Sequence, residues 1–360
     1  MEQALALARL ALGQVSPNPA VGAVIVRDGR VVGQGYTQPP GSDHAEIVAL
    51  RQAGEAARGG TLFVTLEPCC HFGRTPPCTR AIIDAGVAAV HIAMLDPNPQ
   101  VAGKGAEELR QHGIETHVGE GADEAAEIVE AYTKFITTGT PFVIAKFAMS
   151  LDGKIASRSG DSRWISSEES RRYVHSLRHA ADAIMVGVET ILADDPRLTR
   201  RSAEQGGTSH TQPLRVVADA RGRTPLSARV FHEPGSLLLA LGTEADPEVA
   251  EGYRRAGAMV VSLPSERGLV DLEALLRVLG ERRVTSVLVE GGGRLLGSLF
   301  DRHLVDKVTA FVAPVIIGGA RAPTPVAGTG ALRMADAIRL EKVSIRELGR
   351  DVMITGYVTG

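Results

Sequence analysis

The chain has 360 residues, of which 44% are hydrophobic and 22% are charged. This length favours two compact domains, and the composition is that of a globular protein, which excludes intrinsic disorder, collagen-like repeats and coiled coil. The 39 Lys and Arg residues nearly balance the 42 Asp and Glu residues, so the net charge is −3. That balance supplies no overall attraction to nucleic acid or to an anionic membrane, and we expect neither as a partner.

The amino-terminal segment and the cysteines indicate the cellular compartment. The apolar stretch Ala4–Leu12 is interrupted by Arg9 and lacks the features of a secretory signal, so we expect a helix of the folded domain. The only cysteines are Cys69, Cys70 and Cys78. An odd number within ten positions favours metal or catalytic chemistry over a disulfide framework, and predicts a cytoplasmic protein.

Strands alternate with helices in the first 140 residues. The stretch Ala20–Tyr36 has two β-branched runs around Asp28 and Gly29, which predicts a hairpin. Asp43 can cap a helix over residues 44–57, with Glu46 placed three residues later as in a capping box. We then expect, in order, strand 61–67, helix 79–86, strand 88–95, helix 105–112 and helix 123–136. The alternation predicts an α/β layer.

A second α/β pattern follows a linker at residues 137–141, TTGTP, which predicts domains over residues 1–139 and 141–360. Beyond the linker, the expected strands cover 142–150, 183–188, 214–220, 237–241, 286–290, 308–317 and 352–358, and the expected helices cover 168–179 and 272–282.

The clearest chemical signal is a His, Glu and Cys pattern. His44 and Glu46 lie near one helix start, and Cys69 and Cys78 follow a predicted strand. One imidazole and two thiolates are three of the four ligands that tetrahedral zinc prefers, which leaves one position for water. Zinc lowers the pKa of such a water toward ~7, and Glu46 is close enough to relay the proton. This pattern is typical of zinc-dependent base deaminases.

Two alternatives remain open at this cluster. His71 could supply a fourth ligand, which would make the metal site closed and structural. Glu46 could be only a capping-box residue. Spacing alone does not decide whether Cys69 or Cys70 is the metal ligand. We choose Cys69 because it directly follows a proline, as in the deaminase pattern. We then expect Cys70 to be a buried small hydrophobic residue. A thiolate at a helix start would be stabilised by free amide N–H groups.

In the second half, the strand SVLVE leads into Gly291, Gly292 and Gly293 and then into a helical RLLGSLF segment. Such a glycine turn can present backbone amides to a phosphate, or it can be a plain turn. Neither the GxGxxG nor the P-loop pattern occurs.

The segments HAE, LEPCCHFGRTPPC, NPAVG and DPNPQVAGKG resemble the amino-terminal domain of the RibD family of bifunctional riboflavin-biosynthesis proteins. The segments KFAMSLDGKIA, GDSRWIS, ADDPRLT and VEGGGRL resemble the family's carboxy-terminal reductase domain. The resemblance implies a cytidine-deaminase-like three-layer domain followed by a dihydrofolate-reductase-like α/β domain. The eight residues between Cys69 and Cys78 separate the chain from cytidine and tRNA-adenosine deaminases, whose last two ligands are typically two residues apart.

For the first domain, the resemblance implies zinc-dependent hydrolytic deamination of a diaminopyrimidine that carries a phosphoribosylamino group. His44, Cys69 and Cys78 would hold Zn²⁺, and Glu46 would be the catalytic residue. Further substrate contacts are expected from Asn18, His71 and Arg74.

For the second domain, the resemblance implies NADPH-dependent reduction of the ribosyl group to ribityl. The expected cofactor contacts are Ala148, Trp164, Thr190, Asp194, Ala220, Gly292, Gly293, Arg294, Leu295, Leu296, Gly297 and Ser298. The expected substrate contacts are Ser162, Arg178, Leu198, Arg201 and Glu290, of which the two arginines suit a phosphate. Considered singly, Trp164 could be core and Arg178 a solvated helix residue.

The resemblance also implies a homo-oligomer joined through the reductase domains. The competing functions are a zinc deaminase that acts on a nucleic-acid base, against which the acidic chain argues, and a non-catalytic zinc module, against which Glu46 argues.

Overall fold

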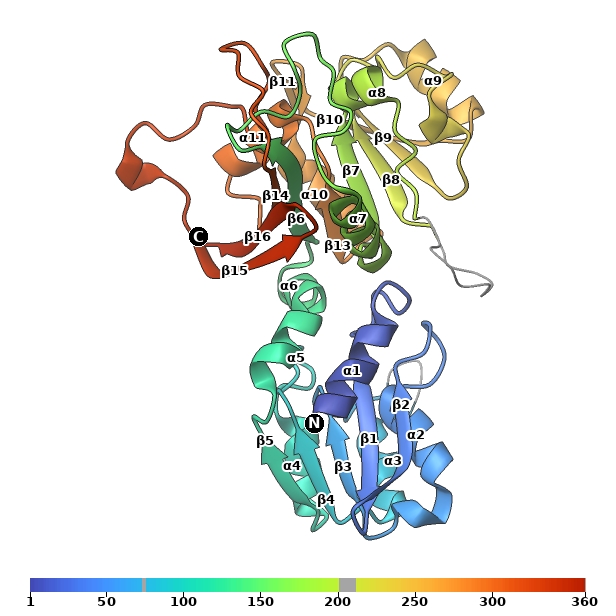
Figure 1. Ribbon diagram of the computed structural model, residues 1–360. Coiled ribbons are helices and arrows are strands. Elements are labelled where there is room, and N and C mark those ends of the chain that lie inside the picture. The colour runs from blue at the N-terminus through green and yellow to red at the C-terminus, as the bar shows by residue number, and fades with distance from the viewer. Residues whose placement is uncertain (73–75, 201–211, 360) are drawn as a thin grey trace. The chain divides into compact units, whose positions relative to one another are not determined.

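The computed structural model describes residues 1–72, 76–200 and 212–359. It divides into two compact units, Met1–Thr140 and Pro141–Gly360, and the division falls at the TTGTP segment (Figure 1). Arg74 and Arg201, both expected to contact substrate, lie outside the described residues.

Unit 1 contains a five-stranded sheet in the order β2-β1-β3-β4-β5. Its strands are β1 (Gly22–Arg27), β2 (Arg30–Tyr36), β3 (Thr61–Val64), β4 (Ala89–Ile92) and β5 (Glu115–Val118). Its helices are α1 (Glu2–Ala11), α2 (Ala45–Ala53), α3 (Cys78–Ala85), α4 (Lys104–Gln111), α5 (Ala122–Ile128) and α6 (Glu130–Thr138), with a 3₁₀ turn at Gly54–Ala57. The hairpin predicted around Asp28 is confirmed as β1 and β2.

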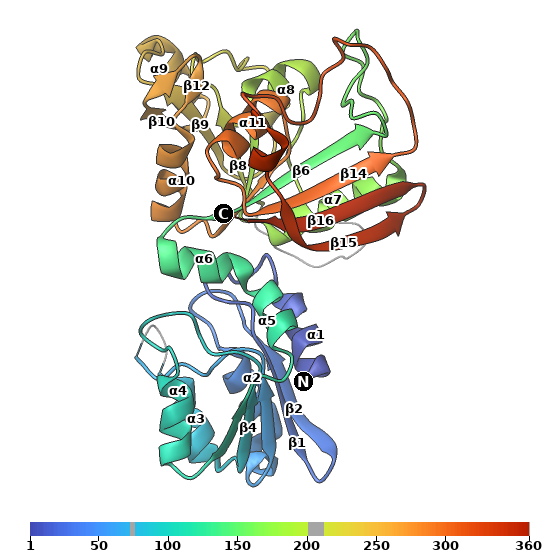
Figure 2. The same ribbon diagram turned by 90° about the vertical axis from the view of Figure 1, so that its left-hand side faces the viewer.

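The sheet of unit 1 is the middle of three layers. On one face, a core cluster joins the sheet to α2, α3 and α4; on the other face, a second cluster joins it to α1 and α5. Figure 2 shows α3 and α4 on one side of the strands and α1 on the other. The cytidine-deaminase-like three-layer fold is therefore confirmed.

Two glycines set how closely α2 approaches the sheet. A Cβ added at Gly33 would lie 2.2 Å from the carbonyl oxygen of Ala49, and one added at Gly35 would lie 2.7 Å from that of Ala45. These distances are too short for any side chain, so β2 must have glycine at both positions for α2 to pack here. The close packing fixes the start of α2, where His44 lies.

Unit 2 contains a nine-stranded sheet in the order β10-β9-β8-β7-β13-β6-β14-β16-β15. Its strands are β6 (Phe142–Ser150), β7 (Ala183–Gly187), β8 (Leu214–Ala218), β9 (Leu237–Gly242), β10 (Met259–Leu263), β13 (Ser286–Val289), β14 (Lys307–Ala313), β15 (Leu340–Leu348) and β16 (Asp351–Val358). The helices are α7 (Glu168–Ala180), α8 (Val188–Asp194), α9 (Pro247–Arg255), α10 (Leu272–Glu281) and α11 (Gly293–Asp301). Short elements are β11 (Ser265–Glu266), β12 (Leu269–Val270) and 3₁₀ turns at Arg229–Phe231 and Met334–Asp336.

In the sheet order given above, each strand from β10 to β14 is parallel to its neighbours in that stretch, whereas β16 is antiparallel to both β14 and β15. Helices α10 and α11 pack on one face, whereas α7, α8 and α9 pack on the other. Strands covered on both faces must be apolar throughout, which explains runs such as β9, buried at all six positions. The α/β architecture expected for this unit is confirmed.

Three expected elements differ in the structure. The expected capping box is wrong, because the N-cap of α2 is His44 and the Asp43 carboxylate instead binds Arg51 at 2.7 Å. The single helix expected over residues 123–136 is two helices, since Val129 leaves helical geometry at φ −104° and ψ 16°. The strand expected over 308–317 ends at Ala313, because a proline follows.

Candidate functional site

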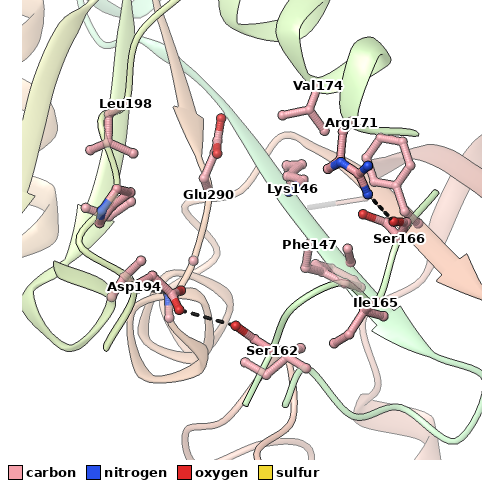
Figure 3. A pocket seen from close by; sticks show the side chains of 18 of the residues that line it. Lys146, Phe147, Ser162, Ile165, Ser166, Arg171, Val174, Asp194, Leu198 and Glu290 are labelled. Atoms are coloured by element: carbon pink, nitrogen blue, oxygen red, sulfur yellow. Dashed lines mark hydrogen bonds between the residues drawn. The ribbon is translucent and has the colours of Figure 1, made fainter. Parts of the chain in front are cut away.

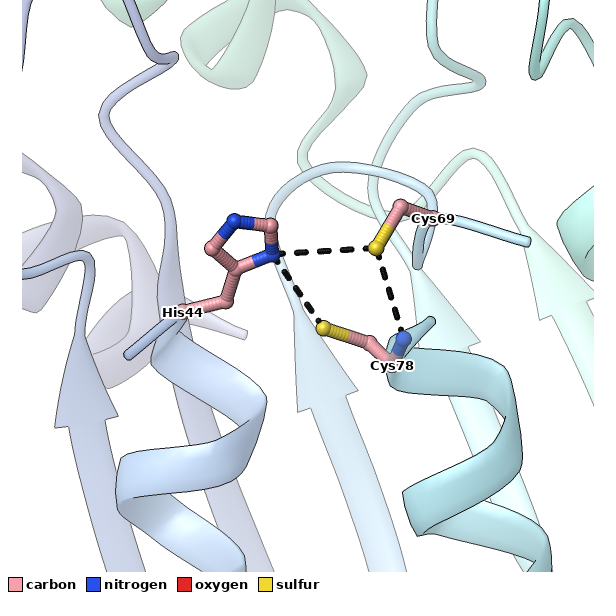
Figure 4. A group of neighbouring side chains, drawn as sticks. All are labelled: His44, Cys69 and Cys78. Atoms are coloured by element: carbon pink, nitrogen blue, oxygen red, sulfur yellow. Dashed lines mark hydrogen bonds between the residues drawn. The ribbon is translucent and has the colours of Figure 1, made fainter. Parts of the chain in front are cut away.

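The predicted zinc ligands come together from three separate elements. His44 precedes α2, Cys69 follows β3, and Cys78 is the first residue of α3. The Nδ1 atom of His44 lies 3.3 Å from the Sγ atom of Cys78 and 3.7 Å from that of Cys69 (Figure 4). The three ligand atoms all lie within 4.8 Å of one another, so they can bind one ion.

The start of α3 stabilises the sulfur of Cys69. The backbone N–H of Cys78 donates to the Cys69 Sγ atom at 3.3 Å (Figure 4). The Cys78 side chain, and then that of His44, hydrogen-bond to Cys69 and lower its pKa to about 4, although burial opposes the shift. A sulfur that is already ionised is the form that binds a metal. The donor set and its charge therefore fit zinc.

The other two candidates for this cluster lie outside it. Among the described residues, the possible metal-binding group consists of His44, Cys69 and Cys78, without His71 or Cys70. Cys70 is partly exposed, so the expectation that it is a buried hydrophobe is wrong. The Nδ1 atom of His71 is buried and has no hydrogen-bond partner within the described ranges 1–72, 76–200 and 212–359. Three protein ligands leave a fourth tetrahedral position for water or substrate.

Glu46 is buried beside the ligands. It lies in the first turn of α2, its exposed fraction is 4%, and its carboxyl group hydrogen-bonds with the Cys78 side chain. Burial, and then the nearby charge of Cys69, raise the pKa of Glu46 to about 7. A carboxyl group with such a pKa can both accept and donate a proton near neutral pH.

Sequence reasoning missed Glu67, a buried carboxylate directly before the Pro68-Cys69 segment. Its oxygens accept hydrogen bonds at 2.9–3.0 Å from the backbone N–H groups of Asp96, Gly103 and Ala106. These bonds hold the loop 96–103 and the start of α4 against the segment that carries Cys69. The only sequence signal is a glutamate at the end of an apolar strand.

Asn18, the remaining substrate residue expected in unit 1, lies in the loop after α1. Its backbone N–H donates to the carbonyl oxygen of Val15 at 2.8 Å, and its side chain is partly exposed.

Unit 2 contains a pocket of about 570 Å³. The expected residues that line it are Ala148, Ser162, Trp164, Arg178, Thr190, Asp194, Leu198, Glu290, Gly292, Gly293 and Leu296. Figure 3 shows Ser162 and Asp194 joined, and the Ser162 hydroxyl lies 3.3 Å from the Asp194 carboxylate. The pocket therefore gathers expected residues that are up to 148 positions apart in the chain, from Ala148 to Leu296.

The glycine turn is held by a threonine. The backbone N–H of Gly292 donates to the Oγ1 atom of Thr190 at 3.0 Å, and the turn continues into α11.

Five residues that we expected to contact the cofactor do not line the pocket. Ala220, Leu295, Gly297 and Ser298 are buried, whereas Arg294 is exposed. A Cβ at Gly297 would lie 1.8 Å from the carbonyl oxygen of Ala327, so this glycine is needed for backbone packing.

Arg178 and Glu290 form a two-bond ion pair inside the pocket. The Nε and terminal nitrogen atoms of Arg178 lie 2.5 and 2.6 Å from the two carboxylate oxygens of Glu290. Its other terminal nitrogen donates to the carbonyl oxygen of Thr199. Arg178 is thus not a solvated helix residue. Lys146 is partly buried nearby, and desolvation lowers its pKa although the charge of Glu290 opposes the shift.

Trp164 is 69% exposed, so it does not belong to the core. It lies at the pocket, and the guanidinium carbon of Arg171 is 4.6 Å from the centre of its ring.

Comparison with known proteins identifies the family. The family model "RibD C-terminal domain" matches residues 141–354, and "Cytidine and deoxycytidylate deaminase zinc-binding region" matches residues 1–94. The RibD protein of Aquifex aeolicus is 41% identical over 354 residues, which cover 98% of this chain and 96% of that protein. The chain belongs to the RibD family. It is a bifunctional riboflavin-biosynthesis enzyme with a zinc-binding deaminase domain and a reductase domain.

Two solved structures agree over the whole length. RibD of Acinetobacter baumannii is 36% identical with a TM-score of 0.88, and covers 100% of this chain and 98% of its own. A diaminohydroxyphosphoribosylaminopyrimidine deaminase/5-amino-6-(5-phosphoribosylamino)uracil reductase of Thermotoga maritima is 35% identical with a TM-score of 0.85, and covers 100% of this chain and 97% of its own. Both units therefore have the fold of this family.

Among the described residues, no helix is long and apolar enough to cross a membrane.

Proposed function

We propose that unit 1 hydrolytically removes ammonia from a diaminopyrimidine that carries a phosphoribosylamino group. We further propose that unit 2 then reduces the ribosyl group to ribityl with NADPH. The similarity to the Thermotoga maritima deaminase/reductase over the full chain supports this substrate. The observation that carries the hydrolytic half is the cluster of His44, Cys69 and Cys78 with a buried glutamate beside it.

In unit 1, His44, Cys69 and Cys78 hold zinc and Glu46 moves the proton. Zinc held there would act as a Lewis acid and supply a water that is nucleophilic near pH ~7. The Glu46 carboxyl group would accept a proton and return it to the leaving amine, and its raised pKa of about 7 suits both directions of transfer.

Substrate recognition in unit 1 is assigned by the same resemblance. We assign contacts to Asn18 and His71, and to Arg74, which lies outside the described residues. His71 has a buried Nδ1 atom that no described residue hydrogen-bonds, and this atom is suited to form a hydrogen bond with a ligand.

In unit 2, the glycine turn and Thr190 bind NADPH together with pocket-lining residues, and the substrate lies beside it. We assign the cofactor to Ala148, Trp164, Thr190, Asp194, Gly292, Gly293 and Leu296, and the substrate to Ser162, Arg178, Leu198 and Glu290, with Arg201 outside the described residues. NADPH supplies the hydride, so these side chains only have to orient donor and acceptor. The Arg178–Glu290 pair gives one wall of the pocket a fixed shape.

The test follows each half-reaction separately in the purified full chain. Ammonia release from the diaminopyrimidine should proceed without NADPH, and NADPH oxidation should begin only after ammonia has been released. Oxidation of NADPH without prior ammonia release would contradict this order. Ammonia release from cytidine but not from the phosphoribosylamino-pyrimidine would contradict the substrate.

We also propose that the enzyme is a cytoplasmic homo-oligomer joined through its reductase units. Three free cysteines suit a reducing compartment. Unit 2 exposes several large apolar side chains, among them Leu332, Met334 and Ile345, whose exposed fractions are 93%, 86% and 68%. Light scattering during gel filtration measures the mass, and a monomer at micromolar concentration would contradict the proposal.

A further inference from the structure

Two side chains of the reductase pocket, those of Arg178 and Leu198, depend on neighbouring segments for their positions. This inference rests on the proposed function, which assigns both to the substrate. Arg178 lies in the last turn of α7, and Leu198 lies in the segment that follows α8 (Figure 3). Glu290, the partner of Arg178, directly follows β13, and its backbone N–H donates to the carbonyl oxygen of Met185 in β7 at 3.0 Å. The sheet therefore fixes Glu290, whereas Arg178 and Leu198 need other contacts.

The backbone of Leu198 has an unusual conformation. Its φ is 52°, in the left-handed region that residues other than glycine rarely adopt. Such a conformation costs free energy, so it persists only where the surrounding structure holds it. The side chain is buried in the core cluster that also contains Ile191 and Val217. Packing fixes this side chain, and hydrogen bonds to the next two residues of the chain fix the backbone.

Arg200 holds the end of α7. Its Nε atom donates to the carbonyl oxygen of Arg178, and one of its terminal nitrogens donates to that of Ala181, both at 3.0 Å. The last carbonyl groups of a helix lack partners within the helix and carry the negative end of its dipole. A guanidinium group suits this place because its planar fork can donate to two carbonyl oxygens at once.

Contacts in the reverse direction complete the attachment. A terminal nitrogen of Arg178 donates to the carbonyl oxygen of Thr199 at 3.2 Å, and Thr199 is buried. The backbone N–H of Arg200 donates to the Oε1 atom of Gln212 at 3.0 Å. Each arginine therefore donates to the backbone of the segment that carries the other. Arg200 itself is outside the set of described residues that line the pocket, so it can act there only through its neighbours.

We propose that Arg200 is a positioning residue of the reductase pocket, which holds the end of α7 against residues 198–200 so that Arg178 and Leu198 meet the substrate in a fixed geometry. Without the Arg200 guanidinium group, the bond from Arg178 to Thr199 alone joins the two segments, and they can move apart. Catalysis that depends on orientation is sensitive to shifts of about 1 Å. Such a movement therefore weakens the contacts with the substrate.

The first experiment measures hydrogen exchange in the full chain without any ligand. In Arg200→Gln, exchange should quicken by about 10-fold at the end of α7, as expected for the loss of charge-assisted bonds. The reporter is the backbone N–H of Ala181, which donates to the carbonyl oxygen of Leu177. Exchange at the start of α7, which the Ser167 hydroxyl caps, should not change. Equal exchange at Ala181 in the variant and in the wild type would overturn the proposal.

Steady-state kinetics measure the effect on the reaction. In Arg200→Gln, the KM for the deaminated pyrimidine in the reduction should rise by about 10- to 100-fold. The KM for NADPH and the rate of ammonia release by unit 1 should stay at the wild-type values. An unchanged KM for the pyrimidine would overturn the proposal, because Arg200 would then be only structural. An equal rise in both KM values would indicate general damage to unit 2 and would overturn it too.

The matched control is Arg215, a buried arginine of β8. Its terminal nitrogens donate to the carbonyl oxygens of Glu233, Pro234 and Gly235, so it has the same kind of contacts as Arg200 away from the pocket. Arg215→Lys and Arg200→Lys both keep the charge and lose the planar fork. Both should lower the urea midpoint, whereas only Arg200→Lys should raise the KM for the pyrimidine, by less than Arg200→Gln does. An equal rise in both lysine variants would overturn the proposal.

These outcomes differ from a failure of the proposed function. A wild-type chain that does not oxidise NADPH with the deaminated pyrimidine would contradict the proposed function. The exchange experiment needs no substrate, so it would still decide whether Arg200 holds the end of α7. Wild-type kinetics in Arg200→Gln would contradict the role of Arg200 and leave the proposed function intact.

Discussion

The buried Glu67 carboxylate offers a sharp test of how the zinc-binding segment is positioned. Its Oε2 atom accepts from the backbone N–H groups of Asp96 and Gly103, and its Oε1 atom accepts from that of Ala106. The side chain is 3% exposed, so water cannot replace these bonds. Glu67→Gln keeps the shape of the side chain and removes the charge and one acceptor.

The cost follows from the three bonds. The amide oxygen of the new glutamine can take the place of Oε2 and keep two bonds, whereas its NH₂ group then faces the N–H of Ala106. Losing charge assistance costs about 1 kcal/mol for each kept bond, and the two buried donors that then face each other cost about 1–3 kcal/mol each. The variant should therefore lose about 4–8 kcal/mol of unfolding free energy, a large part of the typical ~5–15 kcal/mol.

The assay measures zinc release to a chromogenic chelator against urea concentration. Glu67→Gln should release zinc at lower urea, and hydrogen exchange should quicken at the amides of Asp96, Gly103 and Ala106. Glu107→Gln is the control, because Glu107 is exposed on α4 and its nearest cation, Arg110, is 4.0 Å away. Unchanged zinc release and unchanged exchange in Glu67→Gln would refute the reasoning.

Two further predictions concern the thiols and the pocket ion pair. Cys78→Ser should lose most of its zinc at equilibrium with a chelator, while Cys70→Ser should keep it, and equal retention measured by atomic absorption would contradict the ligand set. Burial opposes the ionisation of Glu290, yet the charge and hydrogen bonds of Arg178 leave its pKa below the ordinary 4.5. Because its pKa is lowered, the ionised Glu290 stabilises the folded state above pH 4.5, and this stabilisation is lost as the pH falls below 4.5. The urea midpoint of Glu290→Gln should therefore fall less than that of the wild type when the pH is lowered from ~5.5 to ~3.5. The fluorescence of the sole tryptophan measures the midpoint, and an equal fall in both proteins would contradict the pairing.

Local patterns predicted the features that depend on local chemistry. The turn at Asp28 and Gly29 was predictable because few dipeptides fit a tight hairpin. The grouping of His44 with two cysteines was predictable because one imidazole and two thiols form a donor set with a restricted chemistry. In both cases the residue types by themselves limit the possible structures.

Features that depend on tertiary contacts were not predictable in this way. The capping box failed because Asp43 finds a better partner in Arg51, one that a local motif does not include. Strand β15 was missed because most of its side chains are exposed, so no apolar face marks it. Glu67 was missed because the three amides that it binds are 29–39 residues away in the chain.

The central claim is that a three-ligand zinc site works together with one buried proton carrier. The most direct measurement determines zinc content and the rate of ammonia release in the same preparations of wild type and Glu46→Gln. The account predicts one zinc per chain in both, and a rate lower by about 10²- to 10⁴-fold in the variant. Ammonia release at the wild-type rate by zinc-loaded Glu46→Gln would contradict it.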